Sequence, residues 1–151
     1  MYFRKLIVPA VVATLALSAC ASGGGLRDAE KLSLYRANAG ESVGSFNFFG
    51  RINGWTPLGD SALAVWTRPN EAWLLELHGP CQDLEYTQAI GLTSSGSRVY
   101  AGFDKVLVRS SNPINIPCSI RTIQPLDVKA LRASEKELRE AKAEEREAGA
   151  S

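Results

Sequence analysis

Between about Ser42 and Leu126 the chain alternates short apolar runs with turn residues, and this spacing constrains the fold more than any other feature. The runs are rich in β-branched, aromatic and leucine residues and are bounded by Gly, Pro, Asn or Asp, which is typical of short strands. Turn signals every 8 to 12 residues, roughly, favour a mainly β domain, either a small antiparallel β-sandwich or a barrel-like domain. The predicted strands are Phe46–Ile52, Ala62–Thr67, Ala72–His78, Arg98–Phe103, Lys105–Arg109 and Ile116–Ile123.

The first run predicts a strand that ends in a tight hairpin. Its alternation places Phe46, Phe48 and Ile52 on one face. Asn53 and Gly54 follow at once, and this pair is the strongest short hairpin signal because both residues accept the positive φ of a type I′ turn. We therefore expect a two-residue turn at these positions.

The first 17 residues have the pattern of a secretory signal. Arg4 and Lys5 form a positive start, and Leu6–Leu17 is an uncharged stretch that ends in small residues. A membrane-spanning helix needs roughly 20 apolar residues, so this stretch is too short for that alternative. The pattern predicts export.

Leu17-Ser18-Ala19-Cys20, at the end of the apolar stretch, resembles the lipobox of bacterial lipoproteins. The resemblance implies that Cys20 is joined to a diacylglycerol and that residues 1–19 are a signal peptide, removed just before it. The membrane would then be a partner through the lipid. Because Ala21 rather than Asp follows the cysteine, the resemblance implies the outer membrane, facing the periplasm. Ordinary secretory cleavage and a retained anchor are the alternatives.

The sequence contains three cysteines, Cys20, Cys81 and Cys118. An odd number in an exported protein needs an explanation, and lipid modification of Cys20 leaves the other two free to pair. The oxidising periplasm permits such a bond, which would stabilise the fold by about 3–4 kcal/mol. Two buried free thiols are the alternative, since cysteine also behaves as a small core residue.

The organisation of the chain follows from its composition. We expect a cleaved leader, then a flexible tether at 20–31 that contains Ser22–Gly25. The β domain covers 32–126, and Leu32–Tyr35 leads into it as a short helix or strand. A charged tail, helical or disordered, covers 127–151.

The tail is dense in good helix formers. Glu135 and Arg139 form an i, i+4 pair in the favourable order. Val128, Leu131 and Leu138 make only a thin apolar stripe, which is too short for a coiled coil. We interpret the tail as a solvated helix, with a partner-docking helix as the alternative.

Charge argues against a nucleic-acid partner. The chain has 17 basic and 16 acidic residues, and removal of residues 1–19 takes away Arg4 and Lys5. The mature chain would therefore be close to neutral. It has no concentrated basic segment of the kind that binds phosphate backbones.

No catalytic or metal motif stands out. A Ser–His–acid arrangement could combine His78 with Asp83 or Glu76, but such triads are defined by geometry rather than by sequence position. The candidate serines are Ser94, Ser95 and Ser97. There is no Gly-x-Ser-x-Gly elbow, and with one histidine a zinc site would depend on carboxylates. Asp83 and Glu85 fit solvated charges near a turn. We therefore expect no enzyme activity, no metal and no cofactor.

Aromatic residues supply the candidate partner surface. Phe49 falls on the face opposite Phe46 and Phe48, beside Arg51, and Trp66 likewise opposes the apolar face of its own strand. If the tail helix or a second sheet leaves those faces uncovered, an apolar patch remains, and such patches mark partner sites.

Several segments of the body are similar to an uncharacterised family of small Gram-negative lipoproteins that carry a domain of unknown function. The resemblance covers roughly Ser42 to Asp127. It implies export and a Cys81–Cys118 pair, and it implies no activity. The segments that carry it are Phe48–Trp55, Ala72–Leu77 with Pro80-Cys81, Gly102–Val106, Cys118–Ile120 and Ile123–Leu126.

The sequence thus predicts a lipid-anchored periplasmic envelope protein that works as a non-catalytic binding or scaffolding module. Its partner would be another envelope protein or a small ligand. Two alternatives stay open, namely a small periplasmic hydrolase that uses His78, and a periplasmic inhibitor protein.

Overall fold

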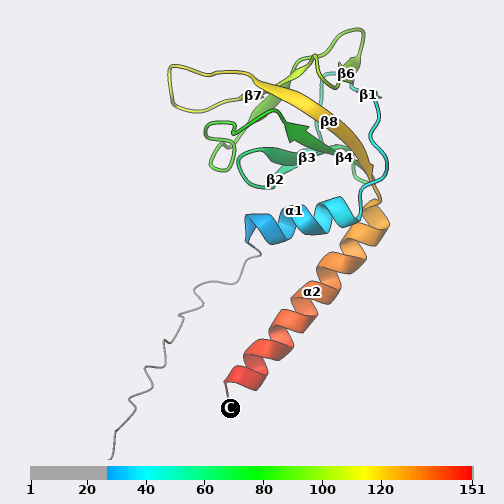
Figure 1. The fold of residues 1–151 in the computed structure, drawn as a ribbon, viewed down its shortest axis with the longest axis vertical. Helices are drawn as coiled ribbons and strands as arrows, with labels where there is room; N and C mark the ends of the chain where they lie inside the picture. Colours follow the sequence, from blue (N-terminus) through cyan, green and yellow to red (C-terminus); the bar gives the residue numbers. More distant parts are fainter. Residues whose placement is uncertain (1–26, 151) are drawn as a thin grey trace, which may run out of the picture.

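The computed structural model describes residues 27–150, so the leader, Cys20 and most of the tether lie outside the described residues. A curled antiparallel sheet, close to half a barrel, carries two helices beneath it (Figure 1). The prediction of a mainly β, barrel-like domain with one disulfide and a C-terminal helix is confirmed. Within residues 27–150, neither helix combines the length and apolarity that crossing a bilayer requires.

Six strands form the main sheet, and every neighbouring pair is antiparallel. In spatial order they are β2 (Gly54–Pro57), β3 (Ala62–Arg68), β4 (Glu71–Leu77), β8 (Cys118–Leu126), β7 (Lys105–Val108) and β5 (Ile90–Leu92). A separate pair consists of β1 (Ser45–Asn47) and β6 (Arg98–Tyr100). The helices are α1 (Asp28–Ala37) and α2 (Val128–Gly149).

The concave side of the sheet holds the larger core. Alternate residues of each strand point into it, and the pair β1–β6 closes it from above (Figure 1). The ring of Phe46 on β1 stacks on Trp73 of β4, with centroids 5.2 Å apart. The fully buried members of this core with under 2% exposure are Phe46, Leu63, Val65, Leu75, Leu84, Val99, Val106, Ile120 and Ile123.

The convex side holds a second core, between the sheet and the two helices. The strand residues here are small, as in Ala64 and Ala72, so the helices approach the sheet closely. Tyr35 of α1 and Leu131 of α2 are both buried against them. Because β3 is covered on both faces, its residues Ala62–Val65 are all buried instead of alternating with exposed ones.

The last strand changes face part of the way along. Leu77 pairs with Ile120, but Glu76 pairs with Thr122, so Arg121 is an extra residue on β8. This β-bulge puts Ile120 and Ile123 into the same core although they are three positions apart.

The predicted Asn53-Gly54 hairpin is wrong. β1 pairs with β6 rather than with β2, and neither Asn53 nor Gly54 has a positive φ. The two-residue turn with positive φ lies instead at Gly96 (57°) and Ser97 (59°), before β6. It is closed by two backbone hydrogen bonds between Ser95 and Arg98, as a type I′ turn requires.

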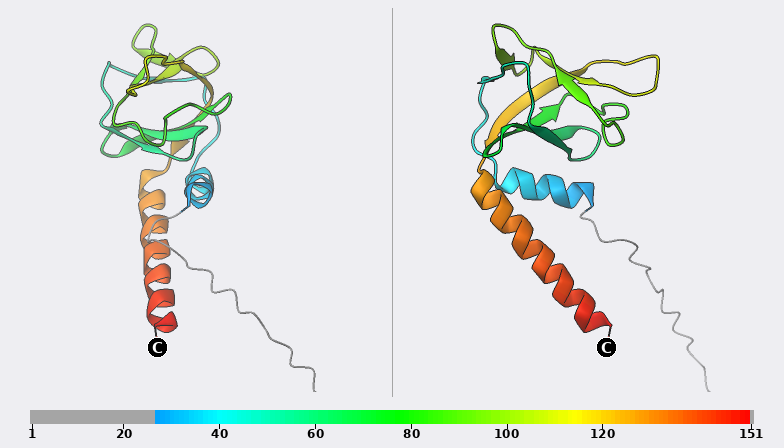
Figure 2. Two further views of the ribbon diagram at one scale, coloured as in Figure 1. Left: turned by 90° about the vertical axis from the view of Figure 1, so that its left-hand side faces the viewer. Right: turned by 180° about the vertical axis from the view of Figure 1, so that it is seen from behind.

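The interpretation of the tail as a solvated helix is wrong for its first turns. Asp127 caps α2 by accepting a hydrogen bond from the backbone N–H of Ala130 at 3.0 Å. Val128 and Leu131 are buried in the second core. Arg132 donates to the carbonyl of Pro69 at 2.7 Å and so clamps the turn between β3 and β4. Figure 2 shows that the rest of α2 runs away from the sheet, and an ion pair between Lys142 and Glu30 at 3.4 Å still links it to α1.

Candidate functional site

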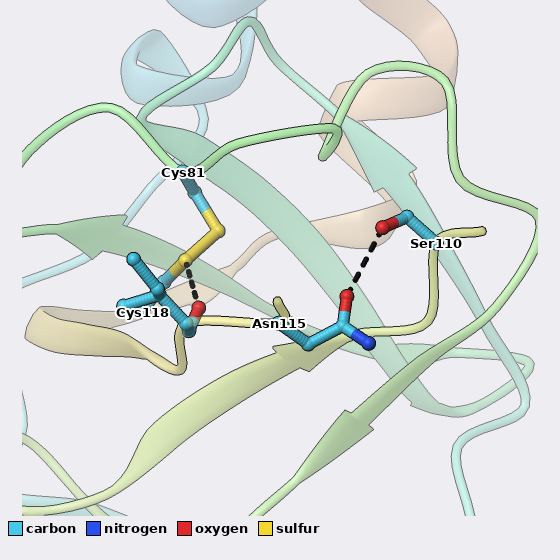
Figure 3. The surroundings of a disulfide bond; sticks show 5 residues. Cys81, Ser110, Asn115 and Cys118 are labelled. Carbon is cyan, nitrogen blue, oxygen red and sulfur yellow. Dashed lines mark hydrogen bonds between the residues drawn. A yellow bond between two sulfur atoms is a disulfide. The ribbon is translucent and has the colours of Figure 1, made fainter. Parts of the chain in front are cut away.

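Two loops meet at one end of the half-barrel, and a disulfide joins them (Figure 3). Cys81 lies in the loop after β4, and Cys118 begins β8, with 5.7 Å between their Cα atoms. The predicted Cys81–Cys118 bond is therefore confirmed. We call loops 78–89 and 109–117, with the bond between them, the disulfide end.

Loop 109–117 is shaped by its own polar side chains and contains no buried residue. The hydroxyl of Ser110 donates to Oδ1 of Asn115 at 3.0 Å (Figure 3). The backbone N–H of Ile114 donates to Oδ1 of Asn112 at 3.1 Å. Bonds of this kind fix a loop without a core.

Loop 78–89 contains a residue in an unfavourable backbone conformation. Asp83 has a φ of 62°, in the left-handed region that L side chains rarely adopt. Its carbonyl accepts hydrogen bonds from the N–H groups of Tyr86 at 3.1 Å and Thr87 at 2.9 Å. Backbone strain of this kind tends to persist at binding sites.

A hydroxyl ties the two loops together at a second point. Oγ1 of Thr87 lies 2.8 Å from the carbonyl oxygen of Arg109 and 2.9 Å from that of Ala89, and can donate to either. The N–H of Arg109 donates to the carbonyl of Ala89 at 3.1 Å. The loops are therefore cross-braced by the disulfide and by these contacts.

A cleft of about 470 Å³ lies between the two loops, within the range of about 300–1,000 Å³ that is typical of small-molecule sites. Four of its side-chain groups, those of Asp83, Gln88, Arg109 and Ser111, make no hydrogen bond or ion pair within residues 27–150 and so are open to a ligand. The lining residues are Asp83, Tyr86, Thr87, Gln88, Arg109, Ser110, Ser111 and Asn112.

Exposed apolar side chains lie in this cleft and in a neighbouring hollow. Tyr86 is 83% exposed, Ile114 70% and Ile116 68%. Ile114 and Ile116 line a small hollow together with Asp83, which also lines the main cleft. The disulfide end thus combines open polar groups with uncovered apolar ones.

Carboxylates gather at the base of loop 78–89. Desolvation raises the pKa of Glu85, and the nearby carboxyls of Asp28 and Asp60 raise it further. Within the described part of the chain, no group of three or more His, Cys, Asp or Glu side chains is placed to hold a metal ion.

The buried carboxylate of Asp104 has a structural role. It is 2% exposed, and it accepts hydrogen bonds from the hydroxyl of Thr93 and from the N–H of Tyr100, both at 2.7 Å. These bonds satisfy a charge that would be costly to bury alone, and they fix the turn between β6 and β7.

The residues considered for catalysis are not brought together by hydrogen bonds. His78 is exposed just after β4. The carboxylate of Glu76 accepts instead from Arg36 at 2.6 Å and from Arg121 at 2.8 Å. Burial alone would raise the pKa of Glu76, but the two arginines outweigh it and hold the pKa below its ordinary value. The serines Ser94, Ser95 and Ser97 lie between β5 and β6.

The residues of the predicted partner surface differ in exposure. Phe49 is 75% exposed and Arg51 is exposed, both in the connection from β1 to β2. Trp66 is half-buried against the second core, and the guanidinium of Arg132 lies 5.8 Å from the centre of its ring. Arg132 of helix α2 thus covers part of the Trp66 ring, which reduces the apolar surface that this residue offers to a partner.

A family model now places the chain among known sequences. The model of a family of unknown function (DUF6491) matches residues 3–142. The chain belongs to this family. No curated protein and no solved structure matches the chain.

The extent of the match corrects one expectation. The resemblance was expected over Ser42 to Asp127, whereas the family model also covers the leader, α1 and most of α2. The burial of Leu131 gives a physical reason, because the first turns of α2 are part of the core.

Sequence reasoning found the cysteines of the disulfide end but missed its cleft. The Ser, Asn and Pro residues of 110–113 do signal a loop. Nothing in the sequence indicated that this loop meets Tyr86, which is 24 positions upstream of Ser110. A positive φ at Asp83 also has only a weak signal, the tolerance of Asp for that conformation.

Proposed function

We propose that the chain is a lipid-anchored protein of the periplasmic envelope, facing the periplasm from the outer membrane, and that it acts as a non-catalytic binding or scaffolding module. Its ligand would be another envelope protein or a small molecule. The observation that carries the binding role is the cleft between the two cross-braced loops.

The shape of this cleft supports binding because it is held before any ligand arrives. The disulfide fixes one side of the loop pair, and Thr87 with Arg109 fixes another. A preformed site loses less conformational entropy on binding than a flexible one. The open side chains of Asp83 and Gln88 then supply specific polar contacts.

The lipid anchor is supported by Leu17–Cys20 and by the apolar stretch before it. A single acyl chain gives only marginal membrane binding, whereas two or more hold a protein stably. A diacylglycerol on Cys20 meets that requirement.

Two measurements test the anchor. Mass spectrometry of the native protein should give an acylated Cys20 as the first residue, and detergent cloud-point separation should put the protein in the detergent phase. An unmodified chain that begins at Ser22 and stays in the aqueous phase contradicts the anchor.

Photo-cross-linking in the intact envelope tests the binding role. A photo-reactive amino acid in place of Gln88, which lines the cleft, should give a specific adduct. The same amino acid in place of Glu137, exposed on α2, is the matched control. Equal adducts from both positions, or none from Gln88, argue against a binding site in the cleft. A tight stoichiometric protein complex would favour the inhibitor alternative.

A further inference from the structure

We propose that the disulfide end rests on the surface of the bilayer, with Ile114 and Ile116 in contact with lipid and Tyr86 at the interface. This inference rests on the proposed lipid anchor and adds a second membrane contact to it. It also places the cleft beside the membrane instead of far out in the periplasm.

The exposed side chains are the first argument. A single exposed apolar residue is normal, but grouped ones tend to mark a partner site. Ile114 and Ile116 line one hollow, and Asp83 of that hollow also lines the cleft that contains Tyr86. Ile114 and Ile116 are more than two-thirds exposed, and the ring of Tyr86 is more exposed still. Aliphatic side chains suit the acyl region, and tyrosine favours the membrane–water interface.

The position of the chain's anchor is the second argument. Asp28, the first residue of α1, lies near Glu85 in loop 78–89, whose pKa its carboxyl raises, and its Cβ would lie 3.8 Å from a Cβ built at Gly59. The start of α1 therefore lies against the disulfide end, and the right-hand view of Figure 2 shows both on the same side of the molecule. Arg27, the first residue that the structure describes, precedes Asp28 and therefore lies at this end as well.

The length of that chain is the third argument. Only seven peptide units separate Cys20 from Arg27, which caps α1. At about 3.6 Å per residue they reach at most about 25 Å. An acylated Cys20 would therefore hold the disulfide end close to the headgroups.

The charges of the two loops indicate which lipid headgroups the disulfide end would contact. Arg109 is the one charged residue of loop 109–117, so this loop meets no repulsion at a membrane surface. The other loop carries Asp83 and Glu85, and the carboxyls of Asp28 and Asp60 lie near Glu85, so acidic groups outnumber Arg109 at this end. We therefore expect closer contact with zwitterionic lipid than with anionic lipid.

The test places a photo-reactive amino acid at Ile116 in the full-length mature protein, inserted through its anchor into phosphatidylethanolamine vesicles. The matched control carries the same amino acid at Phe103, which is 70% exposed but lies outside the two loops. We expect lipid adducts from Ile116 and few from Phe103. Adding phosphatidylglycerol should reduce the adducts from Ile116.

A second variant removes the apolar contact without disturbing the core. With the reporter at Tyr86, the double substitution Ile114→Ser and Ile116→Ser should lower the lipid adducts by roughly tenfold, because membrane contact scales with buried apolar area. Both side chains are exposed, so the variant should fold normally.

The outcomes separate this inference from the proposed function. An anchored protein whose Ile116 reporter gives no lipid adduct, or cross-links to protein or to a second copy, refutes the membrane contact and leaves the anchor intact. A protein without acylated Cys20 refutes the anchor itself.

Discussion

Replacing Leu131 with alanine should destabilise the β domain, although this residue lies in the charged tail. Leu131 is 0% exposed in the second core. The substitution removes three buried carbons at about 0.8 kcal/mol each, or about 2.4 kcal/mol, and the cavity left behind brings the loss to about 3–4 kcal/mol. For a domain of this size we expect the melting temperature to fall by about 10 °C.

The assay is chemical denaturation followed by circular dichroism, with Leu138→Ala as the matched control. Leu138 is the same residue type on the same helix but is only half-buried, so its loss should be about 1 kcal/mol or less. Equal effects of the two substitutions, or a loss below about 0.5 kcal/mol for Leu131→Ala, would refute the placement of α2 in the core. The tail would then be a solvated helix after all.

Four further outcomes can be checked. Glu76→Gln should cost about 1 kcal/mol at neutral pH, since it weakens two charge-assisted hydrogen bonds to half-exposed arginines. Because the pKa of Glu76 is lowered in the folded protein, this stability is fully present above about pH 4.5, the ordinary pKa of the group. It is lost as the pH falls through the pKa of the folded state, so the variant should lose less stability in acid than the wild type. Burial and the charge of Glu135 raise the pKa of Tyr35 to about 12, so absorbance at high pH should show one late-titrating tyrosine. The free energy of unfolding should therefore fall between about pH 10 and 12 in the wild type but not in Tyr35→Phe. The paired substitution of Cys81 and Cys118 by serine should cost about 3–4 kcal/mol in urea denaturation, and an unchanged midpoint would contradict the brace. His78→Ala should fully complement a deletion strain, and a failure to do so would support the hydrolase alternative.

The sequence predicts the strands well where their pairing is local. Ala62–Thr67 and Ala72–His78 agree with β3 and β4 to within one residue at each end, because a short turn joins them and each pairs with the other. Asn53-Gly54 fails for the opposite reason. The strand before it pairs with Arg98–Tyr100, and non-local pairing overrides the local preference of the turn residues.

The packing of the helices was also poorly predicted, because it depends on residues that are distant in the sequence. The sequence predicts only a short helix or strand at Leu32–Tyr35 where the structure has α1, Asp28–Ala37. Few residues of α1 are apolar, and its burial depends on the alanines of β3 and β4. Val128, Leu131 and Leu138 make too thin a stripe to predict a core helix, yet the first two are buried and fix the start of α2 on the sheet. The number of cysteines was enough to predict the disulfide. It could not predict that the bond brings loops 78–89 and 109–117 together, because that depends on the pairing of distant strands.

The disulfide fixes the conformation of these loops, whereas burial in a core fixes the rest of the described chain. A binding surface must stay exposed, so loop 109–117 cannot obtain its shape from a core. Its internal hydrogen bonds are weak in water, and a loop without buried contacts normally opens at low energetic cost. The residue that follows this loop, Cys118, is joined to Cys81, which is 2% exposed and part of the main core, and this bond ties the loop to the rigid body. Reduction should therefore loosen the disulfide end first, while the sheet and both helices keep their own cores.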